Sequence, residues 1–253
     1  MTEYLSQILH LSNQEALVVG TAVFAAGLVR GFAGFGLSAI LMAAVVSIVP
    51  PVELIPVCYI LEAAASIAMF RGGFRDADMT IVWGLVIGSA IGVPAGLLAT
   101  THIDPGISRL IALLIVLGLT LAQLLRLRPR FLATRKGLYA SGLMAGVATG
   151  LASVGGMVVA LYVLARETEP RRMRASLVMF LFIGMFTSLV YLLAYDVMNH
   201  QALWRGLVLS PVVLAGVFLG TLLFRPSLAH LYKQACLLVL IMLCVAGLAR
   251  AIL

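Results

Sequence analysis

Arg30 places a permanent charge in the middle of an apolar run that covers residues 16–49. It opens the segment Arg30-Gly31-Phe32-Ala33-Gly34-Phe35-Gly36, whose glycines weaken a continuous helix. A charge at membrane depth is costly and usually faces a pathway or a partner. We therefore expect a broken or re-entrant helix pair whose Gly-rich turn binds an anion through the planar guanidinium of Arg30. The alternative is a Gly-rich packing face, with Arg30 extending to a lipid headgroup.

A second apolar run, residues 138–165, is interrupted by Thr149-Gly150-Leu151-Ala152-Ser153-Val154-Gly155-Gly156. Exposed backbone N–H groups and helix N-termini at such breaks attract anions. The hydroxyls of Thr149, Ser153 and Ser38 can add donors, or can bond their own helix backbone instead. The predicted substrate-binding residues are Arg30, Gly31, Gly34, Gly36, Ser38, Thr149, Gly150, Ser153, Gly155 and Gly156.

Glu62 is the only acidic residue deep in an apolar run after Pro51. A buried carboxyl group is easier to protonate, so Glu62 is a candidate for coupling transport to protons. The alternative is a salt bridge to Arg30 or a hydrogen bond to a neighbouring helix. Tyr59, Tyr191, Gln123, Thr187 and Ser188 either line a cavity or hold helices together.

The composition indicates a polytopic helical membrane protein. Of the 253 residues, 62% are hydrophobic and only 11% are charged, whereas a soluble domain has about 25% charged residues. The alternating pattern of a membrane β-barrel is absent. The net charge of +7 is carried by short loops, where membrane topology explains it better than a nucleic-acid partner does.

No cofactor, metal site or catalytic constellation is expected. Cys58, Cys236 and Cys244 lie in apolar runs without metal-ligand spacing, and the motifs of metalloproteases, serine hydrolases and P-loop ATPases are absent. We therefore expect neither an enzyme nor an ATP-driven pump.

Six further apolar segments complete an all-α architecture of about eight hydrophobic spans. The segments are residues 52–70, 81–100, 107–125, 173–195, 203–224 and 231–253. Gly88, Gly92 and Gly96 line one helix face and allow a neighbouring helix to approach closely. Residues 1–253 are expected to form one transmembrane domain. The lipid bilayer and a small anion are its expected partners, and the sequence leaves a homo-oligomer open.

Two constant offsets indicate an internal duplication. A shift of 119 residues places Gly27 on Gly146 and Gly31 on Gly150, and a shift of 124 places Gly92 on Gly216. We expect two repeats, about residues 16–126 and 137–253, each a broken hairpin plus three transmembrane helices. Many secondary transporters combine two such repeats with a substrate site at broken helices.

The distribution of Lys and Arg favours hairpins that enter and leave on the same side. If each interrupted run crosses once, the two sides hold 9 and 7 basic residues, apart from Arg30. If each returns to its side of entry, they hold 13 and 3. Because cytoplasmic loops carry the excess of Lys and Arg, we expect inverted repeats with both termini away from the cytoplasm.

These features resemble the TauE/SafE family of sulfite and organosulfur-anion exporters over nearly the whole chain. The segments that carry the resemblance are residues 30–36, Pro50-Pro51, Leu61-Glu62, the glycines at 88, 92 and 96, and residues 149–156, 160–164 and 174–177. The resemblance implies export of small anions such as sulfite, sulfoacetate or other sulfonates and carboxylates across the bacterial cytoplasmic membrane. An anion channel and a non-transporting membrane subunit that binds a partner are the alternatives.

Overall fold

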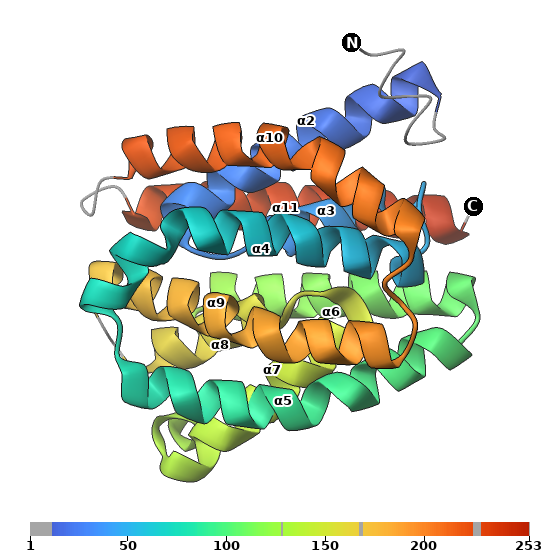
Figure 1. The fold of residues 1–253 in the computed structure, drawn as a ribbon. Coiled ribbons are helices and arrows are strands. Elements are labelled where there is room, and N and C mark those ends of the chain that lie inside the picture. The colour runs from blue at the N-terminus through green and yellow to red at the C-terminus, as the bar shows by residue number, and fades with distance from the viewer. Residues whose placement is uncertain (1–11, 128, 167–168, 225–228, 253) are drawn as a thin grey trace.

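The computed structural model describes residues 12–127, 129–166, 169–224 and 229–252. These residues form ten α-helices and one short 3-10 helix, with no strand among them (Figure 1). The helices are α2 (Asn13–Ala33), α3 (Leu37–Val45), α4 (Pro51–Asp76), α5 (Met79–His102), α6 (Pro105–Leu124), α7 (Arg135–Ala152), α8 (Gly155–Ala165), α9 (Pro170–Ala194), α10 (His200–Leu223) and α11 (Ala229–Ile252), and η1 (Arg130–Ala133) precedes α7.

The long helices confirm a polytopic membrane protein. Among the described residues, six helices are long and apolar enough to cross a bilayer, namely α2, α4, α5, α6, α9 and α10. In α11 the apolar part is the shorter segment Gln234–Arg250. The expected count of eight spans therefore stays a prediction. Large apolar side chains such as Ile91, Phe218 and Leu222 are exposed on the outer surface, as lipid contact requires.

The first break lies between α2 and α3, at Gly34-Phe35-Gly36. Gly34 and Gly36 have φ angles of +81° and +94°, which only glycine adopts without strain. The amide of Gly34 donates to the carbonyl of Arg30 and closes the last turn of α2. The two arms are unequal, with 21 residues in α2 and 9 in α3. Helix α2 continues through Gly31, so Gly31 lies in the first arm and not in the break.

The second break lies between α7 and α8 and has the same backbone conformation at the equivalent position. Ser153, which the shift of 119 places on Gly34, ends α7 with a φ of +57°. Thr149 and Gly150 lie inside α7, and Gly155 begins α8. The interruption predicted for residues 149–156 is therefore confined to Ser153 and Val154, because the preceding glycine is accommodated within a regular helix.

Glycine stripes join the helices in two close pairs. Helix α5 lies along α7, and α10 lies along α2. A Cβ atom added to Gly88 would come within 2.6 Å of the carbonyl oxygen of Tyr139, and one added to Gly31 would come within 2.8 Å of the amide nitrogen of Thr221. The backbones of each pair are therefore in contact, as small residues allow in membrane helices.

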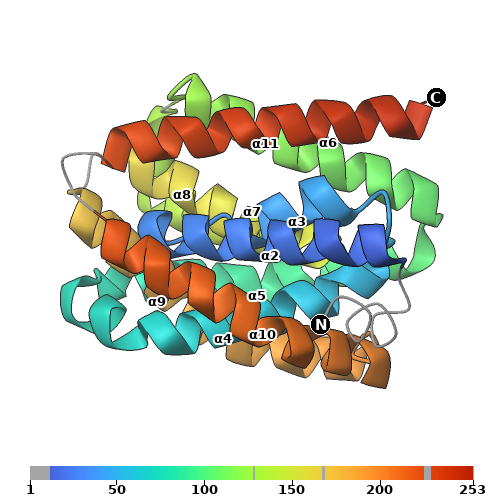
Figure 2. The ribbon, with the colours of Figure 1, turned by 90° about the horizontal axis from the view of Figure 1, so that it is seen from above.

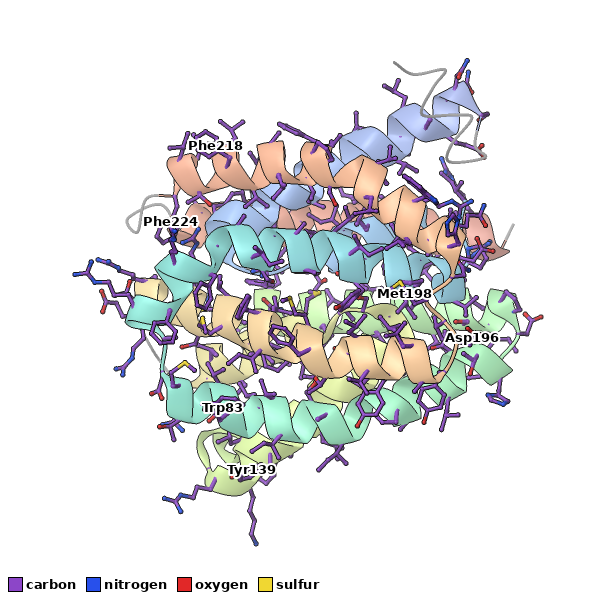
Figure 3. All side chains as sticks on the ribbon, in the orientation of Figure 1. Trp83, Tyr139, Asp196, Met198, Phe218 and Phe224 are labelled. Atoms are coloured by element: carbon purple, nitrogen blue, oxygen red, sulfur yellow. The ribbon has the colours of Figure 1, made fainter. Side chains whose placement is uncertain are left out.

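The connections between helices lie at two opposite ends of the bundle (Figures 1 and 2). The turns after α3, α5 and α9 and the end of α11 lie at one end. The turn after α4, the segment between α6 and α7, the end of α8 and the start of α9 lie at the other. Figure 3 shows that side-chain nitrogen atoms gather at these ends, whereas the middle of the bundle carries mostly carbon. We call the end that holds the turn between α4 and α5 the basic end.

Candidate functional site

Arg30 is fully buried on the last turn of α2. Its Nε donates to Oε2 of Glu62 at 3.0 Å, its Nη2 donates to Oγ of Ser66 at 2.9 Å, and its Nη1 donates to the carbonyl oxygen of Gly34. The guanidinium therefore connects the first break to α4. The alternative that Arg30 extends to a lipid headgroup is wrong, because all three of its nitrogens bind protein groups inside the bundle.

Glu62 holds the other side of this cluster. Its Oε1 accepts the hydroxyl of Ser38 at 3.2 Å and the amide of Ser38 at 3.4 Å, while Oε2 accepts Arg30. The predicted alternative of a salt bridge between Glu62 and Arg30 is confirmed. A buried ion pair is expensive to desolvate and becomes tolerable only when its remaining donors and acceptors are satisfied. Ser38, Ser66 and the carbonyl of Gly34 supply those bonds.

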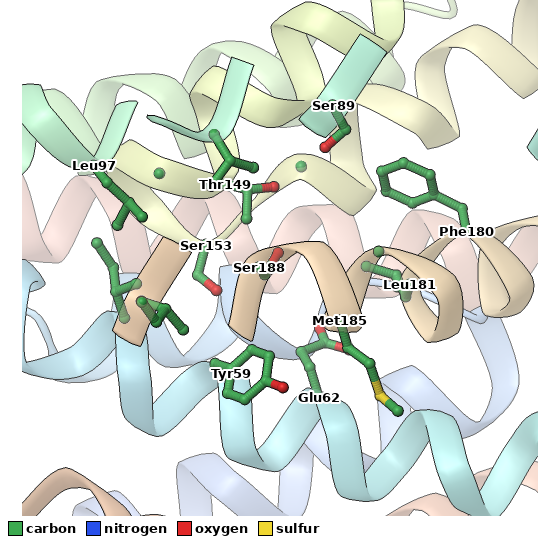
Figure 4. A pocket seen from close by; sticks show the side chains of 16 residues that line it. Tyr59, Glu62, Ser89, Leu97, Thr149, Ser153, Phe180, Leu181, Met185 and Ser188 are labelled. Carbon is green, nitrogen blue, oxygen red and sulfur yellow. The ribbon is translucent and has the colours of Figure 1, made fainter. Parts of the chain in front are cut away.

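A cavity of about 60 Å³ lies beside the second break (Figure 4). Its wall comes from α4, α5, α7, α8 and α9, and its polar members are Tyr59, Glu62, Ser89, Thr149, Ser153 and Ser188. The side chain of Glu62 is 15% exposed, so its carboxyl group is part of the wall. The cavity therefore begins where the Arg30–Glu62 cluster ends.

Four hydroxyls around this cavity are uncommitted. Those of Tyr59, Ser89, Ser153 and Ser188 make no hydrogen bond to another described residue. Elsewhere in the bundle hydroxyls bond a carbonyl of their own helix, as Thr120 does with Val116 and Thr187 with Gly184. Three of the four side chains, Tyr59, Ser153 and Ser188, are half-buried, and none of the four hydroxyls is a fully buried atom without a partner. These hydroxyls are therefore open to a hydrogen bond from within the cavity.

The structure brings some predicted residues together and separates others. Glu62, Thr149, Gly150, Ser153 and Gly155 line the cavity, and Ser38 reaches it only through Glu62. The hydroxyl of Thr149 already donates to the carbonyl of Ala145 at 2.8 Å. The residues outside the wall are Arg30, Gly31, Gly34, Gly36 and Gly156.

The sequence did not predict every residue of the site. For some polar residues it left open whether they line a cavity or hold helices together. Tyr59 and Ser188 line the cavity, whereas Gln123 holds helices together by donating to the carbonyl of Met157 at 3.2 Å. Ser66 was missed although it follows Glu62 by four residues, a spacing that places both on one helix face. Ser89 was missed because it lies inside the glycine-rich helix α5, where the sequence shows only a packing face.

The electrostatics of the cavity differ from a simple basic pocket. Its lining residues include one charged side chain, the carboxyl group of Glu62, and no Lys or Arg. The guanidinium of Arg30 lies directly behind that carboxyl group. The N-terminal turn of α8 adds backbone donors at Gly155, because the first amides of a helix have no partner inside it. Among the described residues no cluster of His, Cys, Asp and Glu is suited to a metal.

Comparison with known families agrees with this geometry. Residues 19–248 match the sequence model described as Sulfite exporter TauE/SafE. The chain belongs to the TauE/SafE family. No match was found among curated proteins or among solved structures. Membership of the TauE/SafE family and the membrane-length helices together identify a multi-pass transport protein of the cytoplasmic (inner) membrane, in a family of sulfur-anion exporters rather than enzymes.

Proposed function

We propose that this TauE/SafE protein is a secondary transporter that exports small anions such as sulfite, sulfoacetate or other sulfonates and carboxylates. The observation that carries the proposal is the convergence of four uncommitted hydroxyls on one cavity inside the membrane bundle. Oxyanions accept several hydrogen bonds at once, which suits a wall of hydroxyl donors. In this proposal the protein moves its substrate and does not catalyse a chemical reaction.

The two halves form inverted repeats in this proposal, about residues 16–126 and 137–253. Each half contributes a broken hairpin followed by three helices, in the order α2 to α6 and then α7 to α11. Helix α5 of the first half packs on α7 of the second, and α10 of the second half packs on α2 of the first. Equivalent helices therefore make equivalent contacts across the two halves. The described start of α2 lies at one end of the bundle and the start of α7 at the other, which supports opposite orientations (Figure 1).

The basic end faces the cytoplasm in this arrangement. The basic residues near this end include Arg71, Arg75, Arg126, Arg135, Lys136, Arg166, Arg171, Arg172 and Arg174, whereas Arg109, Arg205 and Arg250 lie near the other. An excess of Lys and Arg marks cytoplasmic loops. Arg128 and Arg225 also belong to the side with 13 basic residues in the expected topology, but both lie outside the described residues.

The second break and the cluster behind it have different roles in substrate binding. Ser153, Thr149, Gly150, Gly155 and Gly156 bind the anion at or next to the cavity, while Arg30, Gly31, Gly34, Gly36 and Ser38 form the first break, where Arg30 supplies the positive charge. Glu62 lies between that charge and the cavity. Protonating Glu62 removes its negative charge and frees the guanidinium to face an incoming anion. Glu62 is therefore the proposed proton-coupling residue.

Flux from proteoliposomes that contain the full-length protein tests the proposal. Sulfite, sulfoacetate, taurine and lactate are compared with and without a pH gradient. With the membrane potential clamped at zero, we expect selective flux of sulfur oxyanions that the pH gradient can drive against a concentration difference, which a channel cannot do. Absence of flux for every anion would refute the transporter assignment.

Adjacent hydroxyls on α9 provide a matched pair of variants. Ser188 lines the cavity, whereas the hydroxyl of Thr187 donates to Gly184 within its own helix. Losing the hydrogen bond from one hydroxyl to the charged anion should lower kcat/KM about tenfold or more in Ser188→Ala. Thr187→Val should transport like the wild type. Equal rates in both variants would show that the Ser188 hydroxyl does not contact the anion.

A further inference from the structure

A second basic group lies at the basic end, outside the cavity. Arg174, in the second turn of α9, donates from Nε to the carbonyl oxygen of Gly31 at 3.1 Å and from Nη2 to the hydroxyl of Thr221 at 3.3 Å. Its guanidinium carbon lies 4.7 Å from the ring centre of Phe224. The half-buried side chain is therefore held in one place by three groups, which pre-organises it for binding.

Arg174 differs from its basic neighbours in lacking a carboxylate. Arg171 pairs with Asp76 at 2.8 Å, and Arg172 approaches Asp78 at 3.8 Å. Within the described ranges, no Asp or Glu forms an ion pair with Arg174, and its Nη1 has no hydrogen-bond acceptor. A partly buried guanidinium with a spare donor and no counter-charge is a ready site for an anion.

A cavity of about 320 Å³ opens beside this guanidinium. Its wall includes Arg171, Arg174, Asp76 and Phe224, together with the backbone of Gly72 and Gly73. Because Asp76 pairs with Arg171, no described carboxylate compensates the charge of Arg174. A volume of this size holds a small sulfonate or carboxylate together with some of its water. Phe224 lies at the basic end, next to side-chain nitrogen atoms (Figure 3).

Arg174 is also joined to the central site by direct contacts. A Cβ atom added to Gly34 would lie 2.9 Å from Cγ of Arg174, so this side chain packs on the first break. The carbonyl of Gly34 accepts Arg30, which pairs with Glu62 in the cavity wall. Arg174 and Phe224 also line a smaller cavity of about 60 Å³ with Phe32 and Phe35. They therefore separate the outer cavity from the first break.

We propose that Arg174 forms an entry site at the basic end, where a small sulfonate, sulfite or carboxylate binds before it reaches the Arg30–Glu62 pair. This inference rests on the proposed function and assigns its first binding step on the cytoplasmic side. The anion binds to Nη1 in the outer cavity while Gly31 and Phe224 hold the guanidinium. Passage inward then requires Arg174 and Phe224 to move aside.

Oriented membrane vesicles test the entry site with sulfite and sulfoacetate as probes. Inside-out and right-side-out vesicles present the two faces of the full-length protein separately. Arg174→Gln should raise the KM measured from the basic face about tenfold or more, because it removes a charge-assisted hydrogen bond. The KM from the opposite face should change less than about twofold, because an anion that enters from that face does not bind first at Arg174. Arg174→Lys should be intermediate, because it keeps the charge and loses the planar fork.

Arg172→Gln is the matched control, since Arg172 is an exposed neighbour on the same helix. It should leave KM unchanged from both faces. A wild-type KM from the basic face in Arg174→Gln would overturn the inference while leaving the transporter assignment in place. If Arg174→Gln fails to insert, Arg174→Lys decides, and an unchanged KM in that variant overturns the entry site. No flux in the wild type would overturn the transporter assignment and the entry site together.

Discussion

The two helix breaks share a left-handed residue at one equivalent position, Gly34 or Ser153, but differ in the chemistry around them. At the first break, Arg30, Glu62, Ser38 and Ser66 satisfy one another in a closed ionic cluster. At the second, Ser153 borders a cavity where four of the five lining hydroxyls are uncommitted and only that of Thr149 bonds its own helix. A closed cluster resists change because each member depends on the others, whereas open donors are available to a ligand. In the proposed function, the two breaks therefore have different roles.

The largest effect is expected from removing one half of the ion pair. Arg30→Ala leaves the Glu62 carboxylate buried without its cation and should destabilise the protein by about 3–5 kcal/mol. Arg30→Met combined with Glu62→Gln should recover much of that loss, because no charge remains unpaired. Thermal unfolding in detergent measures both. If Arg30→Ala is as stable as the wild type, the ion pair does not hold the first break together.

A smaller effect on stability should distinguish Gly34 in the first break from Gly156 in α8, which follows the second break. Gly34→Ala places a side chain at a φ of +81° and against Arg174, and should cost about 1–2 kcal/mol. Gly156→Ala introduces a Cβ atom that only touches Leu181 at 3.4 Å. This second change should be neutral or stabilise by up to about 1 kcal/mol, since alanine favours a helix. Denaturation midpoints compare the two, and equal losses would contradict the assigned backbone roles.

The smallest effect on stability is expected at Ser153. Ser153→Gly preserves the left-handed conformation and removes the hydroxyl, so stability should stay within about 1 kcal/mol of the wild type. Transport should fall about tenfold or more if that hydroxyl binds the anion. Ser210→Ala is the control, because the hydroxyl of Ser210 donates to Gly206 in its own helix. Unchanged flux in Ser153→Gly would limit the role of Ser153 to ending α7.

The fold followed from the sequence more completely than the site did. Apolar runs bounded by Pro51, Pro105 and Pro170 became helices beginning at those residues, because proline is tolerated at the first helical turn. The position of Gly31 was harder to interpret, since a glycine can interrupt a helix or pack a neighbour closely. The structure assigns Gly31 to packing against α10. The sequence identified Ser153 and Glu62 but gave no reason to join them with Ser89.

The sequence by itself determined the membrane class, the two breaks and the small-residue faces, because each depends on the length of an apolar run or on residues close in the chain. Only the tertiary structure decided which polar groups meet. Arg30 and Glu62 are 32 residues apart, and their contact depends on how α2 and α4 are rotated and how deeply each is placed. The same rotations leave the hydroxyls of Tyr59 and Ser188 facing an open space instead of a partner. Side-chain partners across helices depend on packing, which local sequence does not encode.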